Sequence, residues 1–183
     1  MQLKAQHPAT LGDRPMNEVR REMLDVLGQF LPSLRAMTYV QRIGLTGSIT
    51  TPKREPNDID VVVCIAEGAD LTELATVYRK MSGRLQGMGR GVDVFIFENG
   101  SYIGRPCHHR ECAPGIRQSC TADHCGLRPY LRDDLSVIEL YQTTLTRLPV
   151  LLHPEGWYWD DVPEDVKGFV RQNTWFEGGR DQA

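Results

Sequence analysis

The sequence lacks the features that would mark a membrane-spanning, exported or repetitive protein. No apolar run approaches the roughly 20 residues that a helix needs to span a bilayer. The first fifteen residues, MQLKAQHPATLGDRP, are polar and broken by proline and glycine, without the apolar centre of a signal peptide. Internal repeats and low-complexity segments are also missing. We therefore expect a cytoplasmic protein with no membrane partner.

A strong excess of charge of either sign is missing as well. Lysine and arginine number 21 against 24 aspartates and glutamates, which leaves a net charge of −3 at pH 7. Nothing in the overall charge draws the chain to nucleic acid, so any such contact must come from a local patch. With 183 residues, 40% of them hydrophobic, the chain is long enough for one domain with a real core.

The pattern of apolar residues predicts regular elements in the first half of the chain. Helical spacing begins after Asn17, a good cap, and Pro32 discourages its continuation. Asp70, with Glu73 three residues later, predicts a capped start for a second helix that ends near Gly83. The expected elements are a helix over 17–31, a strand over 37–45, a loop over 49–57, a strand over 58–65, a helix over 70–83 and a strand over 92–97.

The order of these elements indicates an α+β (α/β-like) fold. The later part of the 58–65 strand is apolar on both faces, which is typical of a central strand covered on each side. We expect residues 1–14 to form a flexible arm and residues 15–100 to form the core. Residues 101–183 would then hold a Cys/His-rich insertion, a helix over 133–148 and a tail, all packed on the core.

Cysteine is scarce except in one stretch, CHHRECAPGIRQSCTADHC over residues 107–125. In a reducing cytoplasm we expect thiols or metal ligands rather than disulfides, and Cys64 within its strand should be a packing residue. A structural Zn²⁺ would order a stretch that has little apolar content of its own. The alternative is a surface loop whose side chains bind no metal, because zinc pairs are more often two residues apart. The candidate zinc ligands are Cys107, Cys112, Cys120, Cys125, His108, His109 and His124.

The tail contains a group of aromatic residues interspersed with charged ones. Aromatic rings can stack on bases, but acidic neighbours would repel phosphate, so packing into the core is the favoured interpretation. These aromatic residues are Trp157, Tyr158, Trp159, Trp175 and Phe176.

Three aspartates at strand positions predict a metal site. Asp58 and Asp60 alternate on one strand, so their side chains point the same way. Carboxylates this close repel one another unless a cation lies between them, and hard oxygen ligands suit Mg²⁺ or Mn²⁺. If the 92–97 strand lies alongside, Asp93 adds a third carboxylate. Three carboxylates can hold two cations about 3.5–4 Å apart, as in phosphoryl transfer.

Residues before these aspartates predict a phosphate site. Gly47 would let the backbone approach a phosphate closely, and the Ser48 hydroxyl could bind it. Lys53 and Arg54 in the following loop could neutralise phosphate charge, although solvated loop charges are an equal alternative.

In the pattern of these residues, the chain resembles the DNA-polymerase-β-like nucleotidyltransferase superfamily, in particular its minimal, toxin- or defence-type members. The resemblance covers about residues 15–98 and rests on Gly47-Ser48, Asp58-Ile59-Asp60 and Val92-Asp93-Val94. It implies a mixed sheet with helices on one face. It also implies that Asp58 and Asp60 bind metal, that Asp93 shares the catalytic metal and helps to activate an acceptor hydroxyl, and that Ser48 contacts a triphosphate.

The reaction that the resemblance implies is transfer of NMP from an NTP such as ATP, with release of pyrophosphate. No RNA-binding appendage is recognisable, which suits minimal transferases that modify RNA, tRNA or a protein, some with a cognate antitoxin or partner protein. One alternative is a small-molecule acceptor, as for the antibiotic nucleotidyltransferases. Another is a non-catalytic nucleotide-binding or interaction module, against which the intact triad argues.

Overall fold

A computed structural model describes residues 18–110, 128–132 and 147–174. These residues form an α+β fold with a single six-stranded sheet. The elements are α1 Glu18–Ala36, β1 Val40–Thr46, the 3₁₀ helix η1 Gly47–Thr50, β2 Asp58–Ile65, α2 Thr72–Gln86, β3 Gly91–Glu98, β4 Ser101–Pro106, β5 Leu131–Arg132, β6 Val150–His153 and α4 Glu164–Asn173. The helix expected over 133–148 falls almost entirely outside the described residues.

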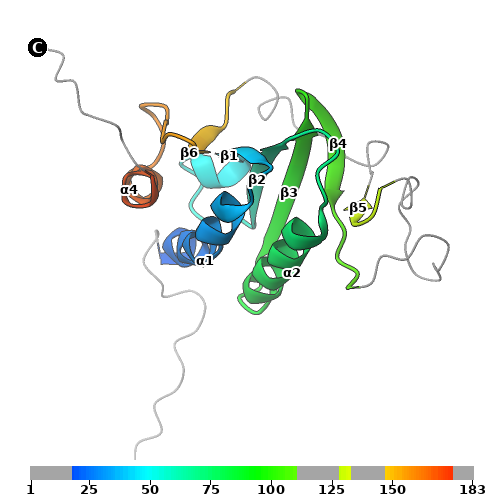
Figure 1. The fold of residues 1–183 in the computed structure, drawn as a ribbon. Helices are drawn as coiled ribbons and strands as arrows, with labels where there is room; N and C mark the ends of the chain where they lie inside the picture. The colour runs from blue at the N-terminus through cyan, green and yellow to red at the C-terminus, as the bar shows by residue number, and fades with distance from the viewer. Residues whose placement is uncertain (1–17, 111–127, 133–146, 175–183) are drawn as a thin grey trace, which may run out of the picture.

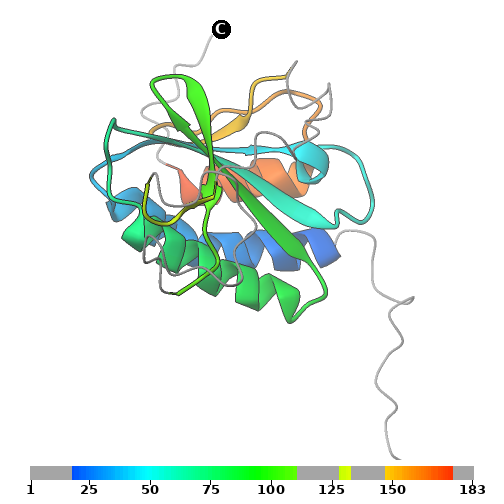
Figure 2. The ribbon, with the colours of Figure 1, turned by 90° about the vertical axis from the view of Figure 1, so that its right-hand side faces the viewer.

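The sheet is mixed, with strand order β5-β4-β3-β2-β1-β6. Only β2 and β3 run parallel, and the other described pairs are antiparallel. Figures 1 and 2 show α1, α2 and α4 together on one side of the sheet, with α1 between the other two. The mixed sheet with helices on one face is therefore as expected.

Alternating burial explains which face of the sheet the helices cover. In β2, the side chains of Ile59, Val61 and Val63 are fully buried, whereas the alternate residues Val62 and Cys64 are only partly buried. β3 alternates in the same way. The apolar stretch that suggested a strand covered on both faces therefore has its described helices on one face. The aspartates of β2 and β3 lie on the other face.

Both expected helices continue beyond their predicted ends. Pro32 lies inside α1, which runs on to Ala36 because Leu31 and Leu34 are buried in the core. Arg35 also donates a hydrogen bond to the Leu152 carbonyl at 2.6 Å. Burial of a helix face outweighs the hydrogen bond that proline removes. Likewise, α2 passes Gly83 and ends at Gln86, because Leu85 is fully buried.

Several elements of the second half escaped the sequence analysis. Asn99 and Gly100 do more than end β3: both have positive φ (50° and 78°) and reverse the chain into β4. An Asn-Gly pair between apolar runs is a strong hairpin signal, but the sequence analysis predicted no hairpin here. Strand β6 and helix α4 were not expected either. No described helix has the length and apolarity needed to cross a membrane.

Candidate metal and nucleotide site

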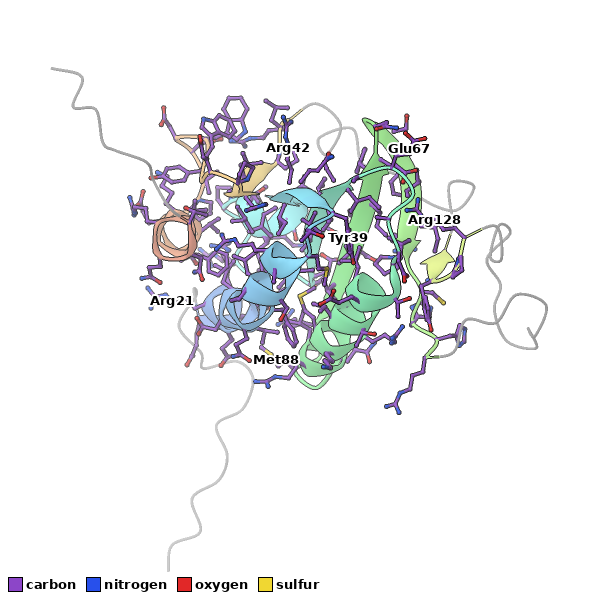
Figure 3. All side chains as sticks on the ribbon, in the orientation of Figure 1. Arg21, Tyr39, Arg42, Glu67, Met88 and Arg128 are labelled. Atoms are coloured by element: carbon purple, nitrogen blue, oxygen red, sulfur yellow. The ribbon has the colours of Figure 1, made fainter. Side chains whose placement is uncertain are left out.

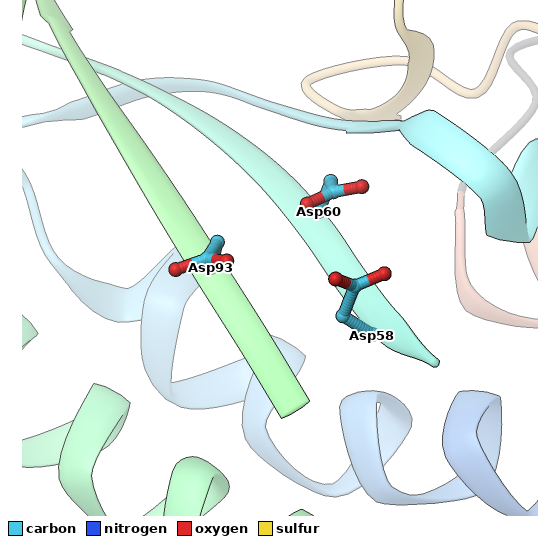
Figure 4. A group of neighbouring side chains, drawn as sticks. All are labelled: Asp58, Asp60 and Asp93. Carbon is cyan, nitrogen blue, oxygen red and sulfur yellow. The ribbon is translucent and has the colours of Figure 1, made fainter. Parts of the chain in front are cut away.

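Three carboxylates meet where β2 and β3 lie side by side. The parallel register places Asp60 directly opposite Asp93, with Asp58 two residues earlier on β2. One carboxylate oxygen from each residue lies within 4.8 Å of the others (Figure 4). Asp93 thus lies on the strand next to Asp58 and Asp60, the adjacency on which the predicted metal site depends. This is a set of hard oxygen donors that can hold a divalent cation.

Gly47 brings the backbone close to these carboxylates. Thr46, the last residue of β1, is paired with Asp60, so the chain turns into η1 directly beside the triad. Gly47 has φ of +71°, and a Cβ atom there would lie 1.8 Å from the Asp60 Oδ2 atom. Both the backbone conformation and the contact require glycine.

Ser48, for which a phosphate contact is predicted, follows Gly47 in the turn. Its Oγ atom is buried and has no hydrogen-bond partner among the described residues. The Thr50 hydroxyl donates to the Gly47 carbonyl at 2.9 Å, and the Thr51 hydroxyl donates to the Ser48 carbonyl at 2.8 Å. The turn is thus fixed by its own threonines, while the serine hydroxyl keeps an unused donor whose burial costs stability.

The surroundings of Asp60 strongly shift its pKa. Burial, together with the negative charges of Asp58 and Asp93, raises the pKa of Asp60 from 3.8 to about 7, and the nearby Arg105 charge opposes this rise. Without a cation, Asp60 therefore holds a proton up to nearly neutral pH. A divalent cation would favour the ionised form and displace that proton.

Arg105 is a site residue that the sequence analysis missed. Its Nη1 atom forms an ion pair with the Asp93 Oδ1 atom, and the two side chains are 18% and 33% exposed. Arg105 lies on β4, so only the Asn99-Gly100 hairpin signal would have placed it next to β3.

The two basic loop residues predicted to bind phosphate are less well placed. Lys53 and Arg54 are exposed in the loop between η1 and β2. In the described part of the chain, no ion pair joins either side chain to the triad. Their proposed role in nucleotide binding stays a prediction.

The zinc prediction falls mainly outside the described residues, which exclude Cys112, Cys120, Cys125 and His124. Of the remaining candidates, Cys107 is buried and its Sγ atom accepts a hydrogen bond from the His109 backbone at 3.4 Å. His108 and His109 lie beside each other, with ring centroids 5.8 Å apart. The zinc site also stays a prediction.

Comparison with known proteins identifies a family but no function. No curated protein matches the chain. A crystal structure from Sulfolobus solfataricus, of a protein inferred to be a nucleotidyltransferase, matches 52% of this chain and 93% of its own. Its identity is 14% and its TM-score 0.31, too low to carry an argument. The model of a family of unknown function, DUF6932, matches residues 8–112, more than half of the chain. The chain therefore belongs to the DUF6932 family.

Proposed function

We propose that this protein is a divalent-cation-dependent nucleotidyltransferase that moves NMP from an NTP to a hydroxyl group of RNA, tRNA or a protein. The observation that carries the proposal is the meeting of Asp58, Asp60 and Asp93 on two adjacent strands. The strand-turn-strand arrangement around Gly47 and Ser48, on which the resemblance to the polymerase-β-like superfamily rests, supports it further.

The residues at the site fit Mg²⁺ or Mn²⁺ as the cofactor. Three carboxylates within 4.8 Å offer oxygen donors of the kind that these cations prefer. Burial, and then the negative charges of Asp58 and Asp93, raise the pKa of Asp60 to about 7, and a bound cation would offset these charges. When bound there, two divalent cations would stabilise negative charge on the reacting phosphate and on the leaving pyrophosphate.

Gly47 and Ser48 would hold the triphosphate. Gly47 has no side chain to keep a phosphate away from the backbone, and the buried Ser48 hydroxyl can donate to a phosphate oxygen. Lys53 and Arg54 would screen the remaining negative charge from the loop.

Asp93 is the triad member proposed to receive the proton of the acceptor. The acceptor oxygen forms a bond to the α-phosphorus while its hydroxyl proton passes to the Asp93 carboxylate. The bond from the α-phosphorus to the bridging oxygen breaks, and pyrophosphate leaves with the electron pair. The unit that performs this reaction would extend beyond residue 100, because β4 pairs with β3 and contributes Arg105.

Incubation with each α-³²P-labelled NTP and MgCl₂ or MnCl₂ tests the proposal, with total RNA or cell lysate as the source of acceptor. We expect transfer of label to fall about 100-fold or more in Asp58→Asn and Asp93→Asn. Asp25→Asn changes an exposed carboxylate on α1 and should transfer normally.

The product identifies the acceptor. Label in RNA or in a protein band supports a macromolecular acceptor, the latter including a toxin–antitoxin or defence partner. Label only in small molecules indicates the antibiotic-type activity. Unchanged transfer by both triad variants would contradict the assignment, and no transfer by the wild type in any mixture would favour a nucleotide-binding module.

A further inference from the structure

The site residues follow one another across the sheet in a definite order. The strand order β5-β4-β3-β2-β1 places the triad in the middle, the Gly47 turn on one side and two arginines on the other. From β5 to the end of β1 the residues are Arg132, Arg105, Asp93, Asp60 with Asp58, and Gly47 with Ser48. The β4–β5 side of the triad therefore carries positive charge that the proposed triphosphate contacts do not use.

The two arginines lie directly opposite each other. Arg105 of β4 is paired with Arg132 of β5 in the antiparallel register. Like charges in opposite positions destabilise a sheet unless negative charge lies nearby. Asp93 supplies such charge to Arg105. The Arg132 Nη1 atom lies 3.3 Å from the His108 Nε2 atom.

The segment that carries Arg132 is attached to the body of the fold. Arg128 donates to the Glu98 carboxylate at 2.8 Å and to the Ala69 carbonyl at 2.5 Å. The Cys107 amide donates to the Tyr130 carbonyl at 2.7 Å. Figure 3 shows Arg128 beside β5, at the side of the sheet away from α1 and α4. These contacts attach residues 128–132 to the end of β3, to the residue after β4 and to the segment before α2.

Aromatic residues continue the same face of the sheet away from Asp93. Phe95 and Phe97 follow Asp93 at two-residue spacing on β3, so all three side chains share a face. The Tyr102 ring on β4 lies 6.2 Å from the Phe95 ring and 5.6 Å from the Phe97 ring, measured between centroids. All three are partly exposed. Many proteins bind single-stranded nucleic acid with aromatic rings and arginines on one face of a sheet.

We propose that Arg105 and Arg132 bind a backbone phosphate of a single-stranded nucleic acid, and that the row Phe95, Phe97 and Tyr102 stacks on its bases. The strand's terminal hydroxyl would then be the acceptor; this last assignment rests on the proposed transferase function. In-line transfer places the entering hydroxyl and the leaving pyrophosphate on opposite sides of the phosphorus. With the pyrophosphate toward Gly47 and Ser48, the acceptor enters from the β4–β5 side.

Binding of 5′-fluorescein-labelled 12-mers, RNA and DNA of one mixed sequence with free 3′ hydroxyls, tests this subsite by fluorescence anisotropy in MgCl₂ without nucleotide. We expect Arg132→Gln to weaken binding about tenfold and to reduce the slope of log affinity against log salt by about 0.7. Phe97→Leu, which removes the ring but keeps an apolar side chain, should weaken binding about fivefold. Arg84→Gln removes an exposed arginine of α2 and should bind as the wild type does.

A parallel measurement separates this inference from the proposed function. Mn²⁺-dependent binding of a non-hydrolysable NTP should be the same in Arg132→Gln, Phe97→Leu and the wild type, which also shows that the variants are folded. The proposed subsite would be overturned if both variants bound the oligonucleotides as tightly as the wild type does. It would also be overturned if the wild type bound neither oligonucleotide. If the wild type does not bind the NTP, the transferase proposal is overturned. The oligonucleotide measurements then still decide whether the subsite binds a single strand.

Discussion

At the scale of single residues, the position that depends most on its residue type is Gly47. Its positive φ of +71° disfavours every side chain, and its would-be Cβ position is occupied by the Asp60 carboxylate. Gly83, in the last turn of α2, has no atom within 4 Å of its would-be Cβ. The two glycines therefore differ in effect: the site requires Gly47, whereas Gly83 only weakens its helix.

We expect Gly47→Ala to destabilise the protein by at least about 1 kcal/mol, because an L-residue is strained at positive φ. It should also weaken Mn²⁺ binding, because the new methyl group displaces the Asp60 carboxylate. Gly83→Ala is the matched control and should stabilise the protein by about 0.5–1 kcal/mol. Urea unfolding and Mn²⁺ titration measure the two effects. Normal stability and normal Mn²⁺ affinity in Gly47→Ala would show that the turn is not pressed against the triad.

At the scale of elements, Arg20 connects three parts of the fold. This α1 residue is buried against α4, where its Nη1 atom lies 3.3 Å from both Asp165 carboxylate oxygens. Its Nη2 atom donates to the Thr51 carbonyl at 3.1 Å and to the Lys53 carbonyl. Both ends of the ion pair are only 4% exposed. Arg20 therefore holds the loop that joins the phosphate-side turn to β2.

Removal of one partner of this buried pair leaves the other charge without compensation. We expect Arg20→Met or Asp165→Asn to lower the free energy of unfolding by about 3 kcal/mol or more. The exposed Glu164, next to Asp165, pairs with Lys167 and Arg171 at the surface and is 75% exposed. Glu164→Gln should change the free energy of unfolding little, because solvent screens an exposed ion pair. Equal losses in Asp165→Asn and Glu164→Gln on chemical denaturation would refute a structural role for the buried pair.

At the scale of the whole molecule, the triad connects stability to pH. Because the pKa of Asp60 is raised from 3.8 to about 7, the folded protein binds this proton more tightly than the unfolded chain does. The unfolding free energy contributed by Asp60 therefore falls as pH rises from about 4 to about 7 and stays low above that. A bound cation would reverse the loss, because it interacts with the ionised carboxylate only in the folded state.

In EDTA, we expect Asp60→Asn to be more stable than the wild type at pH 8 and to have a smaller advantage at pH 5. Asparagine carries no charge in this range, so the difference between the two proteins isolates Asp60 from the other titrating groups. At pH 8, MnCl₂ should raise the melting temperature of the wild type and have little effect on Asp60→Asn. Thermal unfolding at both pH values checks this; a stability difference independent of pH would contradict the raised pKa.

The sequence by itself determined strand β2 and the face of that strand on which its two aspartates lie. Asp58–Ile65 is a β-branched run whose two-residue period alone places Asp58 and Asp60 on one face, and β2 has these bounds in the structure. The Gly47-Ser48 turn was found because glycine, proline and polar residues mark loops by local conformational preference. Both features depend on residues within a few positions of one another.

Only the tertiary structure decided what long-range packing controls. Parallel pairing across a helix placed Asp60 opposite Asp93, and a hairpin brought Arg105 to the same carboxylate. Burial of its apolar face extended α1 past Pro32, although proline locally disfavours a helix. A helix or strand pattern records which residues face a core, but the identity of the neighbouring strand depends on how all the apolar faces are covered together. That is why the aspartates could be found in the sequence, whereas the arginines beside them could not.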